Sequence, residues 1–187
     1  NAPPIRALRH IFPALGDYQF RREADFTDAD ALLHAMDEGR FTRIFFLNPY
    51  GNPHRLSLYR GVKSAGRRFV VWDRGGLSDS WFFDQNGFLA ESDSYSPGHW
   101  DRPLDEERRR KTQTWLEAHN EGETLEENGE RVGAAALRSR LKLGDRKVVF
   151  AALQRPGDTA TVYFAGPCGD AEGFNAWLSH LAGRLDP

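Results

Sequence analysis

Residues 92–103, SDSYSPGHWDRP, gather side chains that could do acid–base chemistry on one short stretch. His99 and Asp101 are two residues apart, so on an extended chain both side chains point to the same side. A histidine beside a carboxylate can act as a general base, and Asp73, which follows an apolar run, is a second carboxylate for this role. The spacing of residues in the sequence does not place a nucleophile beside these groups. The three residues are therefore the candidate catalytic set of a small hydrolase or ligand-binding enzyme.

Aromatic side chains around the same stretch favour a different function, the binding of another protein. Trp, Tyr and Arg contribute most of the binding energy at many protein interfaces. Tyr and Trp also close the rim of a sheet, and Pro97-Gly98 is typical of a turn, so the same residues have a purely structural interpretation. Trp100 is predicted to anchor the loop against the end of the sheet, with His99 facing solvent or Asp73. The candidate binding residues are Trp72, Trp81, Tyr95, Trp100 and Arg102.

Other catalytic and metal-binding motifs are incomplete in this sequence. Residues 139–142 match S-x-x-K, but neither S-D-N nor K-T-G accompanies them. Residues 76–80 resemble G-x-S-x-G without the second glycine, and they join two predicted strands, whereas a nucleophile elbow joins a strand to a helix. His119 and Glu121, with Pro167-Cys168, lack the second cysteine of a zinc deaminase. The sequence therefore predicts no metal and no cofactor.

Composition excludes further classes of function. The 25 basic and 27 acidic residues are intermixed and give a net charge of −2, so no polyanion-binding surface is expected. The basic run 108–111 follows the acids at 105–107, an order that suits an exposed helix better than a nucleic-acid contact. No apolar run reaches the roughly 18 residues of a membrane span. A single cysteine favours the cytoplasm, or the periplasm if residues 1–187 are a processed mature chain.

Short apolar segments between turn residues predict a sheet in the first two thirds of the chain. A helix is expected from Thr27 to Gly39, which provide a cap and a stop. Asn86-Gly87 predicts a two-residue type I′ hairpin that joins strands near 80–85 and 88–92. The spacing leaves no room for crossover helices, so the sheet is expected to be antiparallel throughout. The predicted strands are 17–24, 42–47, 55–59, 67–72, 80–83 and 87–91.

The remaining residues predict helices and one hairpin. Helices are expected at 104–118 and 132–143, and a final helix is expected after a cap at Asp170. Two β-type segments around residues 156–158 predict a hairpin between the last two helices. Residues 119–130 hold many glutamates, two glycines and no lysine or arginine, so an exposed, mobile connector is expected there.

These patterns together predict an α+β fold. An antiparallel meander of five or six strands carries helices on one face, and a helix–hairpin–helix unit docks to it. The domains are 1–118, the acidic connector 119–130, and 131–187, and the whole chain can also be a single domain. Because no catalytic constellation is complete, the sequence favours a non-enzymatic protein that binds another protein, as an inhibitor or immunity-type protein does. The alternative is the small hydrolase or ligand-binding enzyme that uses His99 and Asp101.

Overall fold

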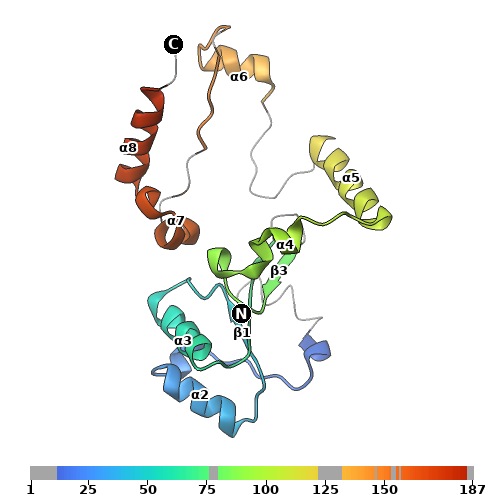
Figure 1. Ribbon diagram of the computed structural model, residues 1–187, viewed down its shortest axis with the longest axis vertical. Coiled ribbons are helices and arrows are strands. Elements are labelled where there is room, and N and C mark those ends of the chain that lie inside the picture. Colours follow the sequence, from blue (N-terminus) through green and yellow to red (C-terminus); the bar gives the residue numbers. More distant parts are fainter. Residues whose placement is uncertain are drawn as a thin grey trace. The chain divides into compact units, whose positions relative to one another are not determined.

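The computed structural model describes residues 12–75, 80–121, 132–145, 147–152, 155 and 157–184. The chain divides into two compact units, Asn1–Asp101 and Arg102–Pro187 (Figure 1). No helix in the described part of the chain is long and apolar enough to cross a membrane.

The first unit contains a sheet of three strands in the order β1-β2-β3. β1 runs parallel to β2 and places Leu47 opposite Trp72. β3 runs antiparallel to β2 and places Phe82 opposite Asp73. The main elements are α2 (Ala29–Glu38), β1 (Ile44–Leu47), α3 (Pro53–Ser64), β2 (Phe69–Arg74), β3 (Trp81–Asp84) and α4 (Pro97–Trp100), and short 3₁₀ turns are η1 (Phe12–Leu15), η2 (Glu23–Asp25), η3 (Leu89–Glu91) and η4 (Asp93–Tyr95).

The prediction of an antiparallel meander with five or six strands is wrong, chiefly because residues 55–59 lie in helix α3. Asn52 caps this helix, with its side-chain oxygen 2.8 Å from the backbone nitrogen of Arg55, and Pro53 occupies the first turn. The buried side chains of α3 lie at helical spacing. The helix connects β1 to β2, and a crossover of this kind is what a parallel pair of strands requires. The buried residues of α3 are Leu56, Leu58, Tyr59 and Val62.

The predicted hairpin at Asn86-Gly87 is also wrong. The side chain of Asp84, which is buried, accepts hydrogen bonds from the backbone nitrogens of Asn86 at 2.6 Å and Gly87 at 2.8 Å. Its other oxygen accepts from the hydroxyl groups of Ser92 and Ser94. Asp84 therefore ends β3 and folds the following residues into the 3₁₀ turns η3 and η4 instead of a returning strand.

Both faces of β2 are covered, so its four residues from Phe69 to Trp72 are all buried. On one face, the buried ring of Tyr59 from α3 packs edge-on against Phe46 and Phe69, with ring centroids 5.7 and 5.3 Å away. On the other face, Trp72 packs with Phe12, Leu47 and Trp81. A central strand with two covered faces reads as a continuous apolar run, as this one does.

A buried polar cluster ties the 3₁₀ turn η3 to helix α3. The carboxylate of Glu91 accepts hydrogen bonds from the hydroxyls of Tyr50 at 2.7 Å and Tyr59 at 2.6 Å, and Lys63 lies 3.1 Å away. Burial alone would raise the pKa of Glu91, but these three partners outweigh it and hold the pKa below its ordinary value. Burial and the hydrogen bond to Glu91 raise the pKa of Tyr50 to about 12.

The described residues of the second unit are mainly helical. The predicted helices at 104–118 and 132–143 are confirmed, as is the final helix, where the Asp170 side chain accepts from the backbone nitrogen of Gly173 at 2.8 Å. The elements are α5 (Glu106–Glu121), α6 (Ala134–Arg140), α7 (Thr159–Phe164), the 3₁₀ turn η5 (Gly166–Cys168) and α8 (Ala171–Ala182).

Three more of the predicted strands differ from the structure. The hairpin expected around residues 156–158 is replaced on its second side by helix α7, because the side chain of Asp158 caps this segment through the backbone nitrogen of Ala160 at 3.0 Å. Residues 147–152 are not in a strand, and neither are residues 17–24, which run into η2. From residue 122 onward, the connector predicted at 119–130 lies outside the described residues.

Candidate functional site

Two polar residues lie at the carboxyl edge of the parallel strands, and the carboxylate of one of them, Asp73, accepts from the backbone nitrogen of Arg74 at 2.7 Å. Asn48 follows β1 directly, and Asp73 is the next-to-last residue of β2. The backbone nitrogen of Asn48 donates to the carbonyl oxygen of Trp72 at 3.0 Å, so the pairing of the two strands continues one residue beyond β1. In this register Asn48 follows the pair Leu47–Trp72 and lies beside Asp73.

Asn48 has an unusual conformation at this edge. Its φ angle is 36°, in the left-handed region that residues other than glycine seldom adopt, although asparagine does so more readily than most. Its carbonyl oxygen accepts from the backbone nitrogen of Gly51 at 3.0 Å and from Arg55 Nη1 at 3.1 Å. Its side-chain Oδ1 is buried and has no hydrogen-bond partner, and among the described residues it is the one buried side-chain atom of this kind. Such atoms are rare in folded proteins and call for an explanation.

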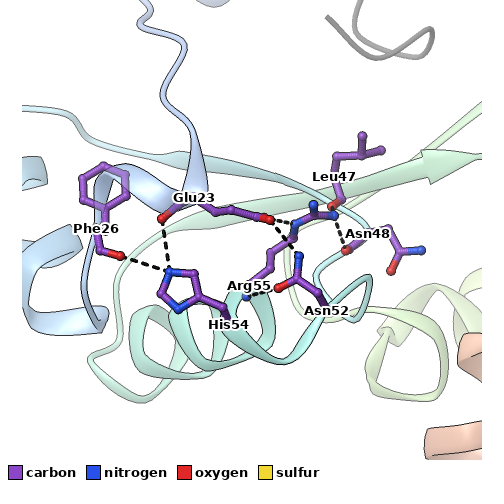
Figure 2. Close-up of polar contacts among 7 residues, drawn as sticks. All are labelled: Glu23, Phe26, Leu47, Asn48, Asn52, His54 and Arg55. Atoms are coloured by element: carbon purple, nitrogen blue, oxygen red, sulfur yellow. Dashed lines mark hydrogen bonds and ion pairs between the residues drawn. The ribbon is translucent and has the colours of Figure 1, made fainter.

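A network of charged and polar groups fixes the turn that contains Asn48 (Figure 2). Arg55 donates from Nε to Glu23 at 2.5 Å and from Nη1 to the carbonyl oxygen of Leu47 at 2.9 Å. The amide nitrogen of Asn52 donates to the other carboxylate oxygen of Glu23 at 2.7 Å. The hydrogen bond from Arg55 is the main reason that the pKa of Glu23 lies below its ordinary value, against the opposing effect of burial.

His54 belongs to the same network and has a structural role. Its Nε2 lies 3.0 Å from the carbonyl oxygen of Phe26 and 3.2 Å from that of Glu23. Both partners are acceptors, so Nε2 carries a proton and donates to them. The ring therefore ties the start of α3 to the segment around η2, as Figure 2 shows.

Aromatic rings lie next to the polar pair on the helix-covered side of the sheet. Phe82 of β3 is directly opposite Asp73 of β2, so their side chains are neighbours on one face. The ring of Tyr95 stacks on Phe82, with centroids 5.8 Å apart and planes inclined by 23°. Tyr95 is 57% exposed, so most of this ring remains accessible. The edge thus combines hydrogen-bonding groups with an accessible aromatic surface.

The other predicted site residues lie elsewhere. Trp72 and Trp81 pack against each other on the opposite face from Asp73, with centroids 5.7 Å apart, and Trp72 is buried. His99 and Asp101 are exposed at α4, where His99 Nδ1 lies 2.7 Å from the hydroxyl of Ser96. No described contact joins them to Asp73. Of the predicted residues, the structure brings Asp73 and Tyr95 to one place, through Phe82.

The prediction that Trp100 anchors the loop is wrong. Trp100 is 62% exposed, and its indole nitrogen donates to the carbonyl oxygen of Tyr95 at 2.9 Å. Tyr95 makes the contact with the sheet instead, through Phe82. Arg102, the last candidate binding residue, begins the second unit.

Asn48 is not among the candidate residues that the sequence predicts, although one signal for it is present. An asparagine follows the apolar run IFFL (44–47) at once and begins the turn NPYGNP (48–53). A polar residue in this position matters when the strand is parallel to its neighbour, because carboxyl ends then share an edge. The sequence predicts an antiparallel sheet, in which the carboxyl ends of neighbouring strands lie at opposite edges, and such a sheet gives no reason to select Asn48.

A shallow hollow at the opposite, amino edge of the sheet is less suited to a ligand. The helices α2 and α3 both end nearby, and their C-terminal ends carry partial negative charge that the local arginines offset. The side chain of Arg67 is bound by both carboxylate oxygens of Asp37 at 2.7 Å. The hollow is lined by Met36, Phe41, Thr42, Gly66, Arg67 and Arg68.

The described residues contain no group of three or more His, Cys, Asp or Glu side chains that could hold a metal ion. In comparisons with known proteins, no family model, no curated protein and no solved structure matches the chain.

Proposed function

We propose that the first unit binds a small polar molecule at the carboxyl edge of β1 and β2. The observation that carries this proposal is the parallel β1–α3–β2 crossover, whose two strand ends place Asn48 beside Asp73. In doubly wound sheets, ligands bind outside the carboxyl ends of the strands at the point where the strand order reverses, and the single crossover here shares with them the common carboxyl edge of two parallel strands. This function corresponds to the ligand-binding alternative from the sequence, with a different set of residues.

The chemistry of the edge describes the ligand. Asp73 and the buried Oδ1 of Asn48 are hydrogen-bond acceptors, so they favour a molecule that carries donors such as hydroxyl groups. The stacked rings of Phe82 and Tyr95 provide an adjoining apolar surface. Binding sites for small molecules commonly combine such a surface with a few placed polar groups.

A titration of the isotope-labelled full chain tests this proposal. Uridine, adenosine, myo-inositol and catechol, each at millimolar concentration, offer hydroxyl groups with and without an aromatic ring. We expect at least one of them to shift the amide signals of Asn48, Asp73 and Tyr95. Replacing Asp73 with alanine should weaken this binding about 10-fold or more, as expected for the loss of a charged hydrogen-bond partner.

The control is Asp30→Ala, which removes an exposed carboxylate on helix α2 and should leave the binding unchanged. The proposal fails if no probe shifts these signals. It also fails if the shifts centre on His99 and Asp101 and disappear in His99→Ala, because that result would favour the original enzyme alternative.

The exposed aromatic rings of Tyr95 and Trp100 support a second candidate, the binding of another protein. The two rings are 57% and 62% exposed and belong to the short helical turns η4 and α4. Exposed aromatic side chains on an ordered surface resemble the residues that contribute most to protein interfaces. This surface is the basis for proposing an inhibitor or immunity-type protein without enzymatic activity.

For this second candidate, we expect Trp100→Ala to abolish specific capture of a partner from a cell extract while the protein stays folded. The loss of one interface tryptophan commonly weakens binding by about 2 kcal/mol or more, roughly 30-fold. Quantitative affinity capture with mass spectrometry measures the effect. Trp177→Ala is a matched control because this side chain is 50% exposed on α8. Equal capture by both variants would exclude the Tyr95–Trp100 surface.

A further inference from the structure

We propose that Asn48 determines which ligands the carboxyl edge accepts, by taking one hydrogen bond from a hydroxyl or amino group of the ligand through Oδ1. This inference rests on the proposed function of the same edge. It narrows the ligand class to molecules that place a donor at this position. It also gives a binding role to Asn48, which is not among the aromatic and acidic residues that the sequence predicts as candidates.

The unpaired Oδ1 of Asn48 raises the free energy of the ligand-free protein. A buried acceptor without a partner is unfavourable because it has lost its hydrogen bonds with water. A ligand that donates to Oδ1 removes this cost on binding. An analogue without the donor leaves the cost in place, and a site of this kind rejects such an analogue strongly.

The backbone of Asn48 is also strained. A φ angle of 36° is unfavourable for a residue with a side chain and persists only where the surroundings impose it. Here three hydrogen bonds impose it, to the carbonyl oxygen of Trp72, from the backbone nitrogen of Gly51 and from Arg55. Glycine would fit this conformation without strain. The same three hydrogen bonds therefore hold the unpaired amide of Asn48 at the carboxyl edge.

The position of the Asn48 side chain also favours a contact with a ligand. Figure 2 shows that the Asn48 side chain points away from the Glu23–Arg55 network, which uses the backbone of Asn48 and leaves its amide group unused. The amide thus adds no described hydrogen bond to the turn. A hydrogen bond to this amide would come from another molecule, and Asp73 follows Trp72 at the same edge of the sheet.

The decisive experiment compares Asn48→Gly and Asn48→Asp in the full chain. Asn48→Gly should raise the thermal unfolding midpoint, because it removes both the strain and the buried unpaired acceptor, and it should weaken binding about 10- to 100-fold. Asn48→Asp keeps an acceptor oxygen and should retain binding of the donor. The probe is whichever of uridine, adenosine, myo-inositol or catechol shifts the Asn48 signal, and its O-methyl derivative should bind wild type about as weakly as the probe binds Asn48→Gly.

Arg40→Gly is the matched control for the backbone effect. Arg40 also has a positive φ, 54°, but it is exposed and contributes no buried unpaired atom. Its replacement should give a smaller gain in midpoint and leave binding unchanged. A lower midpoint for Asn48→Gly would overturn the inference, because it would mean that the side chain stabilises the fold. Unchanged binding in Asn48→Gly would overturn it while leaving the proposed function intact, and the absence of binding by every probe would overturn both.

Discussion

Replacing Glu91 with alanine is expected to lower the free energy of unfolding of the first unit by about 3 kcal/mol, since hydrogen bonds to a charged group contribute about 1.5–3 kcal/mol each and several are lost. The hydroxyl of Tyr59, which is fully buried, loses its carboxylate acceptor at 2.6 Å, and Lys63 loses its ion-pair partner. Hydrogen exchange of the amides of β2 in the full chain measures the change.

The same cluster predicts loss of stability in acid. The pKa of Glu91 is lower in the folded protein than its ordinary value, and the same holds for Asp84, whose hydrogen bonds outweigh the effect of burial. A lowered carboxyl pKa contributes stability that is present above the ordinary value of about 4.3 and is lost as the pH falls through the folded pKa. Wild type should therefore lose stability below about pH 4, and Glu91→Ala should show a shallower loss.

Glu38→Ala controls for the general effect of removing a glutamate. The carboxylate of Glu38 pairs with His34 on the surface of α2, and both side chains are at least 70% exposed. An exposed pair contributes about 0–1 kcal/mol, so this variant should resemble wild type. A loss below about 1 kcal/mol for Glu91→Ala would mean that water replaces the carboxylate and that η3 is not held by the cluster.

Several elements could be predicted from local patterns because their signals are unambiguous. The helix α2 is found where it is expected, although its cap is Asp28 and not Thr27, with the Asp28 side chain accepting from the backbone nitrogen of Ala31 at 2.9 Å. The final helix α8 has the predicted cap, Asp170. The strands β1, β2 and β3 coincide with apolar and aromatic runs bounded by turn residues. In these segments propensity, capping and burial agree.

The topology could not be predicted, because short apolar segments fit either a strand or a helix. The apolar residues in 55–59 predict a strand, whereas Asn52-Pro53 provide a helix cap and a first-turn proline within the apparent turn NPYGNP. The error removed the crossover and with it the parallel pair. At Asn86-Gly87, the deciding partner is the side chain of Asp84, which captures both backbone nitrogens. Such competition is visible in the structure and not in a dipeptide preference.

The candidate site could be predicted only in part, because residue types do not reveal the strand topology. Asp73 and Tyr95 were selected by residue type, and both lie at the carboxyl edge. His99 and Trp100 were selected in the same way and lie on the exposed turn α4. Asn48 required knowledge of strand direction and of one buried oxygen, neither of which residue type reveals.

Arg55→Met is expected to destabilise the first unit by about 2 kcal/mol, within the range for hydrogen bonds that involve a charged group. Methionine keeps the packing of the stem but removes the guanidinium, which is bonded to Glu23 and to the carbonyl oxygens of Leu47 and Asn48. The carboxylate of Glu23, which is two-thirds buried, then loses its charged partner. Arg67→Met is the matched control, because its pair with Asp37 is about half exposed and contributes about 0–1 kcal/mol.

The effect of Arg55→Met should reach the ligand edge, because Arg55 is one of the groups that impose the left-handed conformation of Asn48. We expect probe binding to weaken together with stability, and the amide of Asn48 to exchange faster. A double-mutant cycle with Glu23→Gln measures the coupling of the ion pair, for which we expect about 1–2 kcal/mol, as for residues within one hydrogen-bond network. Additive effects would show that Arg55 acts through the two carbonyl oxygens alone. Equal losses in Arg55→Met and Arg67→Met would refute the role of Arg55 in holding the β1–α3 turn.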